Sequence, residues 1–306
     1  MPFLSFQRSS RDSHLAMTTH PPFPFLIGAP RSGTTLLRLM LDAHPALAIP
    51  PETGFLPKIC RFRIGLRARK RFFKLITGFP GYSPNWGDFG LDAGALWREL
   101  QRIEPFDQAD GIRAFYRMYA AKHGKVRYGD KTPTYCEHIR RIEERLPEAH
   151  WIHIIRDGRD VALSLRRTWF APSQNMTALA KYWRRMIRRA RQASGTSYLE
   201  VRYESLVRDP QPVLEQICRF IQLDFDPIML RYWERAPGRL KEHRERYGRN
   251  GDVVVSHEQR LHQQRLTMAP PEPARIGVWK DEMTVAEQAA FRRGAGDLLK
   301  DLDYKW

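Results

Sequence analysis

Short apolar runs alternate along the chain with longer segments in which apolar residues recur at helical spacing. The apolar runs predict buried strands at residues 25–28, 127–129, 151–155 and 198–201, and a weaker one at 47–49. The longer segments predict helices at residues 34–43, 56–76, 112–122, 135–146, 161–168, 179–193 and 212–221. Strands separated by helices are typical of βαβ units. We therefore expect an α/β fold with a central parallel sheet flanked by helices on both faces.

The length of the chain and its polar segments indicate one domain. The chain has 306 residues, which is enough for one large α/β domain or two small ones. The long polar stretch 237–273, rich in Arg and His, predicts a mobile flap rather than a second domain. Residues 1–20 are expected to form a disordered leader, with Met17 as an alternative start, and residues 21–306 the single domain.

The start of the chain and its cysteines favour a cytoplasmic location. The first 20 residues contain no signal-peptide apolar block, and prolines at positions 21, 22, 24 and 30 argue against a membrane helix there. Cys60, Cys136 and Cys218 are far apart in the sequence and odd in number. This pattern argues against a disulfide framework and a zinc site, and it fits a reducing compartment.

The charge balance points to an anionic partner. Apolar residues make up 42% of the chain and charged residues 28%, which excludes a disordered or collagenous protein. Lys and Arg number 51 against 34 Asp and Glu, a formal net charge of +17. Such an excess suits a nucleotide, a nucleic acid, a polyanionic glycan or a membrane surface.

A first phosphate-binding signal follows the first predicted strand. Gly28 and Gly33 have the spacing of a Walker A loop, in which backbone N–H groups at a helix N-terminus cradle phosphate. Thr34 replaces the lysine that reaches the outer phosphates of a nucleotide, which predicts a poor NTPase. The turn instead contains Arg31, and Thr34 and Thr35 add two hydroxyl donors. This combination favours an anion site over glycines that serve backbone geometry alone.

A second signal follows the strand predicted at 151–155. Arg156 lies at the carboxyl end of that strand, where ligands of open α/β sheets bind, and Ser164 follows eight residues later in the next predicted helix. One phosphate can take a charge-assisted bond from Arg156 and a hydroxyl bond from Ser164. In the alternative interpretation, Arg156 pairs with Asp157 or Asp160 and Ser164 is an ordinary helix residue.

These motifs resemble those of sulfotransferases that use 3′-phosphoadenosine 5′-phosphosulfate (PAPS). The run from Pro30 to Leu36, Pro-Arg-Ser-Gly-Thr-Thr-Leu, is similar to their 5′-phosphosulfate loop, and the spacing of Arg156 and Ser164 to their 3′-phosphate site. Leu-Asp-Ala-His-Pro at 41–45, followed by Glu52, is similar to the tyrosylprotein sulfotransferases and their bacterial relatives. Arg275-Ile-Gly-Val-Trp-Lys resembles the C-terminal segment that closes over the 3′-phosphate, although its Gly-to-Trp interval is short.

The resemblance implies a P-loop NTPase-like three-layer fold and a role for each matching residue. It places PAPS against Arg31, Ser32, Gly33, Thr34, Thr35, Arg156, Ser164 and Arg275. Lys131, after another predicted strand, corresponds to the lysine at the bridging oxygen; alternatively it is an exposed lysine paired with Asp130. Glu52 corresponds to the general base, with His44 as its rival. Arg31, Lys131 and Glu52 are thus the expected catalytic residues, and no metal is expected.

The sequence therefore predicts a PAPS-dependent sulfotransferase that transfers a sulfuryl group to a hydroxyl or amine acceptor. A glycan, a lipid, a small molecule and a protein tyrosine all stay open as acceptors, and so does the oligomeric state. Two alternatives are a P-loop nucleotide kinase or NTPase, and a non-catalytic binder of nucleic acid or another polyanion. Basic clusters at 58–74 and on Lys181, Arg184, Arg185 and Arg188 are interpreted as solvated faces.

Overall fold

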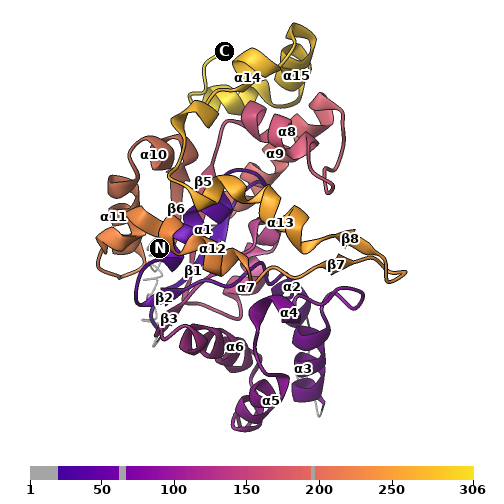
Figure 1. Ribbon diagram of the computed structural model, residues 1–306, viewed down its shortest axis with the longest axis vertical. Helices are drawn as coiled ribbons and strands as arrows, with labels where there is room; N and C mark the ends of the chain where they lie inside the picture. The colour runs from indigo at the N-terminus through magenta and orange to yellow at the C-terminus, as the bar shows by residue number, and fades with distance from the viewer. Residues whose placement is uncertain (1–19, 62–66, 194–196) are drawn as a thin grey trace, which may run out of the picture.

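A parallel four-stranded sheet forms the centre of the protein in the computed structural model, which describes residues 20–61, 67–193 and 197–306 (Figure 1). The strand order is β4 (Asp130–Lys131), β1 (Phe23–Ile27), β5 (Ala149–Ile155) and β6 (Tyr198–Arg202). Phe23 of β1 lies opposite Ala149 of β5, and Ile27 opposite His153. The predicted leader lies outside the described residues, apart from its last position.

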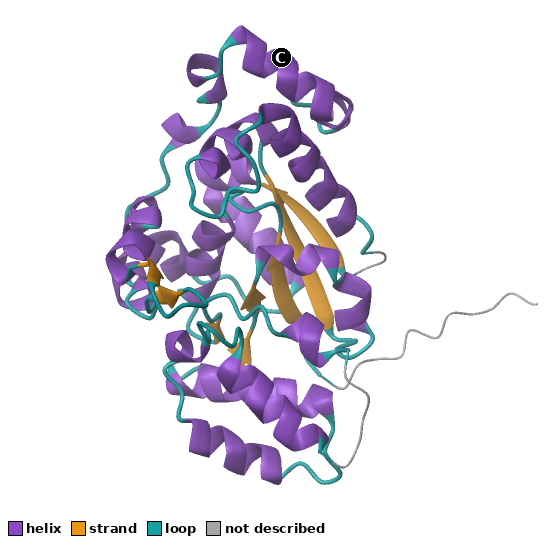
Figure 2. Cartoon of the chain, turned by 90° about the vertical axis from the view of Figure 1, so that its right-hand side faces the viewer, coloured by secondary structure: helices purple, strands orange, loops and turns teal. Residues whose placement is uncertain are grey.

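Helices cover both faces of this sheet, as Figure 2 shows. Phe23, Phe25 and Trp151 belong to one hydrophobic cluster, whereas Leu26 and Ile152 belong to another, because successive side chains of a strand point to opposite faces. The first cluster includes α6 (Gln108–Lys122), α7 (Ile139–Glu143), α8 (Gly158–Arg166), α9 (Met176–Ala190) and α15 (Val285–Asp301). The second includes α1 (Thr34–Asp42), α10 (Tyr203–Arg208), α11 (Pro210–Phe220), η2 (Pro227–Glu234) and α12 (Ala236–Leu240). The predicted three-layer α/β fold is confirmed.

Two predicted elements are divided in the structure. The helix expected at 56–76 is wrong as one unit: α2 (Leu56–Ile59) ends early, α3 (Ala68–Gly78) begins later, and residues 62–66 lie outside the described ranges. The helix expected at 135–146 is a 3-10 helix, η1 (Pro133–Glu137), followed by α7. His138 interrupts it with a non-helical backbone (φ −135°, ψ 14°). The strand expected at 127–129 is shorter in the structure. It forms β3 (Arg127–Tyr128), which pairs with β2 (Leu47–Ala48) outside the main sheet, and the main sheet is joined only by β4, at Asp130–Lys131.

The segment predicted as a polar flap carries secondary structure that the sequence analysis did not predict. It contains the hairpin β7 (Arg246–Tyr247) and β8 (Val253–Val255), then α13 (His257–Gln263), η3 (Arg265–Met268) and η4 (Pro273–Arg275). Arg239, at its start, donates to both carboxylate oxygens of Asp42 at the end of α1, at 2.6 and 3.0 Å. The segment is thereby attached to the helix that follows the predicted phosphate loop.

Three further short helices, and the basic face of α9, complete the fold. The helices α4 (Trp86–Phe89), α5 (Ala93–Gln101) and α14 (Trp279–Glu282) were not predicted from the sequence. On α9, Arg184 and Arg188 contact Asp297 of α15, and Arg185 contacts Glu137, which supports a solvated, ion-paired face. No helix in the described ranges combines the length and the apolar content needed to cross a bilayer.

Candidate active site

The predicted functional residues gather at one edge of the sheet, where all four strands end. The loop 28–33 follows β1, Lys131 ends β4, Arg156 follows β5 and Tyr203 follows β6. The strands are parallel, so their carboxyl ends meet at the same edge. Residues more than 170 positions apart in the chain, from Arg31 to Tyr203, are thereby brought to one place.

The loop between β1 and α1 has a backbone that demands glycine at two positions. Gly33 has φ +96°, and a side chain there would overlap the ring of Tyr203. A Cβ at Gly28 would lie 2.6 Å from the carbonyl oxygen of Ile154. Arg31 also adopts positive φ (74°), which turns its side chain away from the loop backbone and towards α8. The first amides of α1 have no partners within the helix, so the loop presents N–H groups to an anion.

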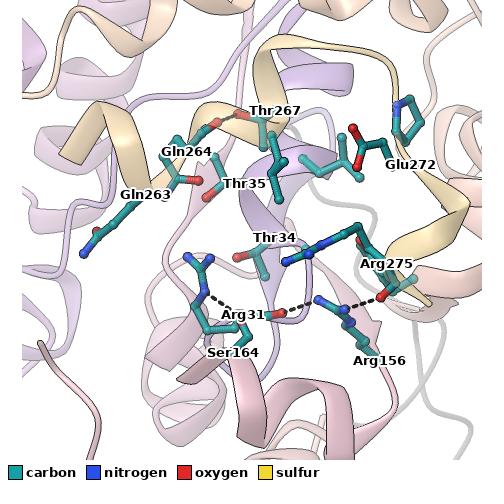
Figure 3. Close-up of a pocket in the computed structure, with 15 residues that line it drawn as sticks. Arg31, Thr34, Thr35, Arg156, Ser164, Gln263, Gln264, Thr267, Glu272 and Arg275 are labelled. Atoms are coloured by element: carbon teal, nitrogen blue, oxygen red, sulfur yellow. Dashed lines mark hydrogen bonds between the residues drawn. The ribbon is translucent and has the colours of Figure 1, made fainter. Parts of the chain in front are cut away.

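A cavity lies above this loop, and most of the predicted PAPS-binding residues line it (Figure 3). Arg31 donates from Nε to the Ser164 hydroxyl at 3.1 Å. Arg156 donates to the carbonyl oxygens of Arg31 (3.4 Å) and Arg275 (2.7 Å), and so joins the loop to the C-terminal segment. The lining residues include Arg31, Gly33, Thr34, Thr35, Arg156, Ser164, Tyr203, Gln263, Gln264, Thr267, Glu272 and Arg275. Two motifs recognised separately in the sequence therefore form one site.

The cavity concentrates positive charge. Three arginines line it, and Glu272 is the sole acidic residue among its lining residues. Burial, together with the nearby charge of Arg156, lowers the pKa of Arg31. Arg156 stacks on the ring of Tyr203, with its guanidinium carbon 4.4 Å from the ring centroid, and its Nε is buried without a hydrogen-bond partner. Arginines held this close repel one another, and a bound anion would relieve that repulsion.

Ser32 and Trp279 do not reach the cavity. The Ser32 side chain is fully buried, and its hydroxyl has no hydrogen-bond partner in the described structure. Trp279 is buried under Arg159, whose guanidinium carbon lies 3.5 Å from its ring centroid. Asp160 binds the backbone N–H groups of Gly277 (2.8 Å) and Trp279 (3.0 Å) and so anchors this segment. Arg156 does contact Asp160, at 3.6 Å, but this does not prevent it from lining the cavity.

Lys131 and Glu52 form an ion pair beside the cavity. The Lys131 ammonium donates to Glu52 at 2.6 Å and lies 3.4 Å from the Thr35 hydroxyl, which lines the cavity. Lys131 is only 4% exposed, whereas the Glu52 side chain is 54% exposed. Burial lowers the pKa of Lys131, and the Glu52 carboxylate opposes that shift. The alternative of an exposed lysine paired with Asp130 is wrong, because Lys131 is buried and its partner is Glu52.

Asp130 belongs to a buried hydrogen-bond network that holds the backbone beside Lys131 and Glu52. Its Oδ2 accepts hydrogen bonds from the hydroxyls of Thr53 and Tyr116, each at 2.8 Å. The Thr53 hydroxyl also lies 2.7 Å from the Tyr135 hydroxyl. Burial raises the pKa of Asp130 to about 6. The network holds the residue after Glu52 and the residue before Lys131, so it sets the distance between the two charged groups.

His44 has a structural role. One ring nitrogen, Nε2, lies 2.9 Å from the Asp224 carbonyl oxygen, and Nδ1 accepts from the Ala46 N–H at 3.0 Å. The ring is buried, and both nitrogens are engaged by backbone groups. The nearby Asp42 carboxylate accepts from the Ile49 N–H at 2.8 Å. Asp42 and His44 thus shape the connection that leads from α1 to Glu52, and His44 offers no free nitrogen for acid–base chemistry.

The sequence analysis missed the lining residues that come from α10 and from residues 263–272, whereas it predicted Arg275. Tyr203 could have been found, since it follows a predicted parallel strand and the ends of such strands share an edge. Gln263, Gln264 and Thr267 gave no comparable signal. They reach the cavity only because the segment folds back over α1.

The fold is that of a P-loop-like α/β protein, with a cationic cavity at the carboxyl edge of its sheet. Residues 22–227 match the model of the Sulfotransferase family, and the chain belongs to that family. This membership does not favour the two alternatives, a nucleotide kinase or NTPase and a non-catalytic polyanion binder.

Two relatives and two solved structures illustrate the similarity. A putative protein-tyrosine sulfotransferase of Caenorhabditis briggsae is 28% identical over 220 residues, 69% of each protein. Protein-tyrosine sulfotransferase A of Caenorhabditis elegans is 26% identical over 223 residues, 69% of this chain but only 52% of that protein. The sulfotransferase domain of the Synechococcus PCC 7002 olefin synthase superposes with a TM-score of 0.57 at 24% identity, covering 94% of this chain and 98% of that one. Mouse sulfotransferase SULT7A1 complexed with PAP superposes with a TM-score of 0.50 at 15% identity, covering 92% of this chain and 86% of that one. At these identities the structural likenesses show the fold.

Proposed function

We propose that the protein transfers the sulfuryl group of PAPS to a hydroxyl or amine acceptor and releases 3′-phosphoadenosine 5′-phosphate (PAP). One observation carries the proposal: the cationic cavity adjoins the Lys131–Glu52 pair, because Thr35 lines the cavity and its hydroxyl lies 3.4 Å from the Lys131 ammonium. A donor with two anionic ends fits the cavity, and the ion pair supplies an acid and a base where the donor's sulfate would lie. The mouse relative in complex with PAP supports the choice of donor.

The anionic groups of the donor divide between two halves of the cavity. The loop amides, Arg31, Thr34 and Thr35 would hold the 5′-phosphosulfate, because they surround the N-terminus of α1. Arg156 and Ser164 would hold the 3′-phosphate, with Arg275 covering it from the C-terminal segment. Both halves provide charge-assisted hydrogen bonds, which are the strong ones in a partly buried site.

The transfer step follows from the charges beside Thr35. The acceptor oxygen forms a bond to sulfur while the bond from sulfur to the bridging oxygen breaks, and that electron pair stays on the 5′-phosphate of PAP. Arg31 and Lys131 stabilise the charge that develops there. The Glu52 carboxylate, half exposed and within reach of an acceptor, takes the acceptor's proton. Lys131 therefore changes partner from Glu52 to the donor when the donor binds.

Two measurements test the proposal. PAP without Mg²⁺ should raise the melting temperature by several degrees at saturation, because a ligand at 100 times its Kd adds about 2.7 kcal/mol of stability; ATP with Mg²⁺ should not. The purified protein is then incubated with radiolabelled PAPS and a lysate separated into lipid, glycan, small-molecule and protein pools. Label should enter one pool. A protein that binds PAP and labels none of the four would overturn the proposed activity.

A further inference from the structure

Glu52 lies in a stretch of chain that has no regular secondary structure. Residues 51–55 connect β2 to α2 outside any helix or strand. Within the described ranges, no backbone N–H donates to the carbonyl oxygen of Glu52 or to that of Thr53. The Asp130 network holds Thr53 through its N–H, which donates to the Thr132 hydroxyl at 3.2 Å, and through its hydroxyl. Backbone oxygens of a folded protein are nearly always paired, so these two carbonyl groups need a partner from elsewhere.

The side chain of Asn85 is that partner. Its Nδ2 donates to the carbonyl oxygen of Glu52 at 3.0 Å and to that of Thr53 at 3.1 Å. Both of these atoms are acceptors, so only the NH₂ group of the amide, which carries two protons, can satisfy them together. A Cβ at Gly54 would lie 3.8 Å from the same nitrogen. One amide therefore fixes two consecutive peptide groups, beginning with that of Glu52 itself.

Asn85 is in turn held by its own neighbours. Its N–H donates to the Phe79 carbonyl oxygen at 2.6 Å, and its carbonyl oxygen accepts from the Asp88 N–H at 2.9 Å. Asp88 belongs to α4, which lies close to β7 (Figure 1), and it is only 1% exposed. The Asp88 carboxylate pairs with Arg246 of β7 and Arg260 of α13. Asn85 is thus anchored by a buried charge cluster that does not include the Glu52 carboxylate.

This anchor matters because Glu52 loses its ionic partner during the proposed reaction. Lys131 donates to the Glu52 carboxylate at 2.6 Å. In the proposed transfer step Lys131 turns to the donor, and the Glu52 side chain, which is 54% exposed, is then released from that ion pair. A reacting group that is poorly placed lowers the rate steeply. The bonds from Asn85 bind the backbone of Glu52, so they persist when Lys131 changes partner.

We propose that Asn85 is the positioning residue of the general base: it holds the backbone of Glu52 and Thr53 so that the Glu52 carboxylate faces the acceptor after Lys131 has turned to the donor. The inference rests on the proposed sulfuryl transfer. Asn85 does not line the donor cavity and acts through Glu52. It should therefore contribute to kcat and not to the binding of donor or acceptor. An asparagine with a merely structural role contributes to stability alone.

Three substitutions at position 85 test this role. Asn85→Ala removes the amide by shortening the side chain, Asn85→Leu removes it at similar size, and Asn85→Gln keeps it on a longer side chain. Initial rates with saturating radiolabelled PAPS, over a dilution series of the lysate pool that takes up label, separate kcat from the half-saturating amount of acceptor. We expect Asn85→Ala and Asn85→Leu to lower kcat about 10–100-fold, and Asn85→Gln to lose less. The half-saturating amount and the Kd for PAP should stay within about twofold.

A double-mutant cycle shows whether Asn85 acts through Glu52. In the Glu52→Gln protein, Asn85→Ala should lower the remaining kcat by less than about twofold, because the base that it positions is already lost. The same loss in both backgrounds would overturn the inference, since Asn85 would then act on something other than Glu52. A wild-type kcat in both Asn85→Ala and Asn85→Leu would overturn it as well.

A second asparagine controls for stability. The side chain of Asn175 caps α9 by accepting from the Ala178 N–H at 3.0 Å, and it does not line the donor cavity. Asn175→Leu should lower the melting temperature by a few degrees, as the loss of a helix cap does, and keep the wild-type kcat. If it loses as much kcat as an Asn85→Ala protein of equal melting temperature, the effect of Asn85 is one of stability and the inference is wrong. A wild-type protein that binds PAP but labels no pool overturns the proposed function, whereas an active wild type with fully active Asn85 variants overturns the inference alone.

Discussion

The sharpest prediction concerns Arg156 and the 3′-phosphate of the donor. Arg156→Ala removes a guanidinium that donates to two carbonyl oxygens and leaves Asp160 with its two backbone N–H partners. A charge-assisted contact in a partly buried site contributes about 2–4 kcal/mol to binding. The Kd for PAPS should therefore rise by a factor of about 30–1,000, since 1.4 kcal/mol corresponds to about tenfold.

The matched ligand for this prediction is adenosine 5′-phosphosulfate, which differs from PAPS only by lacking the 3′-phosphate. Its affinity should not fall in Arg156→Ala. Arg156 is one of the charges that lower the pKa of Arg31, so its removal also relieves repulsion on the arginine proposed to hold the sulfate. Calorimetric titration of both ligands, without acceptor, into wild type and variant measures the two changes.

A surface variant controls for the loss of one positive charge. Arg188→Ala removes an exposed cation on α9 that pairs with Asp297, away from the cavity, and should leave both affinities unchanged. Equal losses of PAPS and adenosine 5′-phosphosulfate affinity in Arg156→Ala would refute the reasoning. In that case Arg156 would act by holding the loop and the Arg275 segment together, not by binding the 3′-phosphate.

Three further predictions follow from the residues beside the cavity. Glu52→Gln should lower kcat by about 10²–10⁴ with unchanged PAP affinity; recovery of activity at acid pH would instead show that Glu52 acts by keeping Lys131 protonated, because the Glu52 carboxylate supports the pKa of Lys131. Turnover should survive EDTA, because Arg31 and Lys131 supply the positive charge that Mg²⁺ supplies in P-loop kinases; a loss that Mg²⁺ restores would contradict this. The pKa of Asp130, about 6, lies above its ordinary value, so the folded state keeps a proton that the unfolded state has released. That contribution to stability is fully present below about pH 4 and is lost as the pH rises through 6. Between pH 4.5 and 7, the unfolding free energy of the wild type should therefore fall by about 2 kcal/mol relative to that of Asp130→Asn, as measured by urea unfolding. If the difference between the two proteins does not change with pH, the prediction is wrong.

The sequence alone determined the sheet and the local chemistry of its edge. β1 is a continuous apolar run, and β5 is apolar apart from His150 and His153, because strands buried on both faces need no polar alternation. The glycines and Arg31 of the first loop, and Arg156 and Ser164 after β5, were recognisable because each motif lies within a few residues of one strand. The predicted cytoplasmic location and the acceptor class rest on the sequence and stay predictions.

Tertiary structure decided which of these residues meet and what surrounds them. The pairing of Lys131 with Glu52 joins positions 79 apart in the chain, and no local pattern specifies it. The segment 237–273 looked like a featureless polar flap because its order comes from distant carboxylates, Asp42 and Asp88, that bind its arginines. The same contacts bury His243, which is only 8% exposed. Other parts of the chain create the environment of His243, so the sequence shows this residue only as one of ten histidines. Its Nδ1 becomes a buried atom without a hydrogen-bond partner only once the chain has folded.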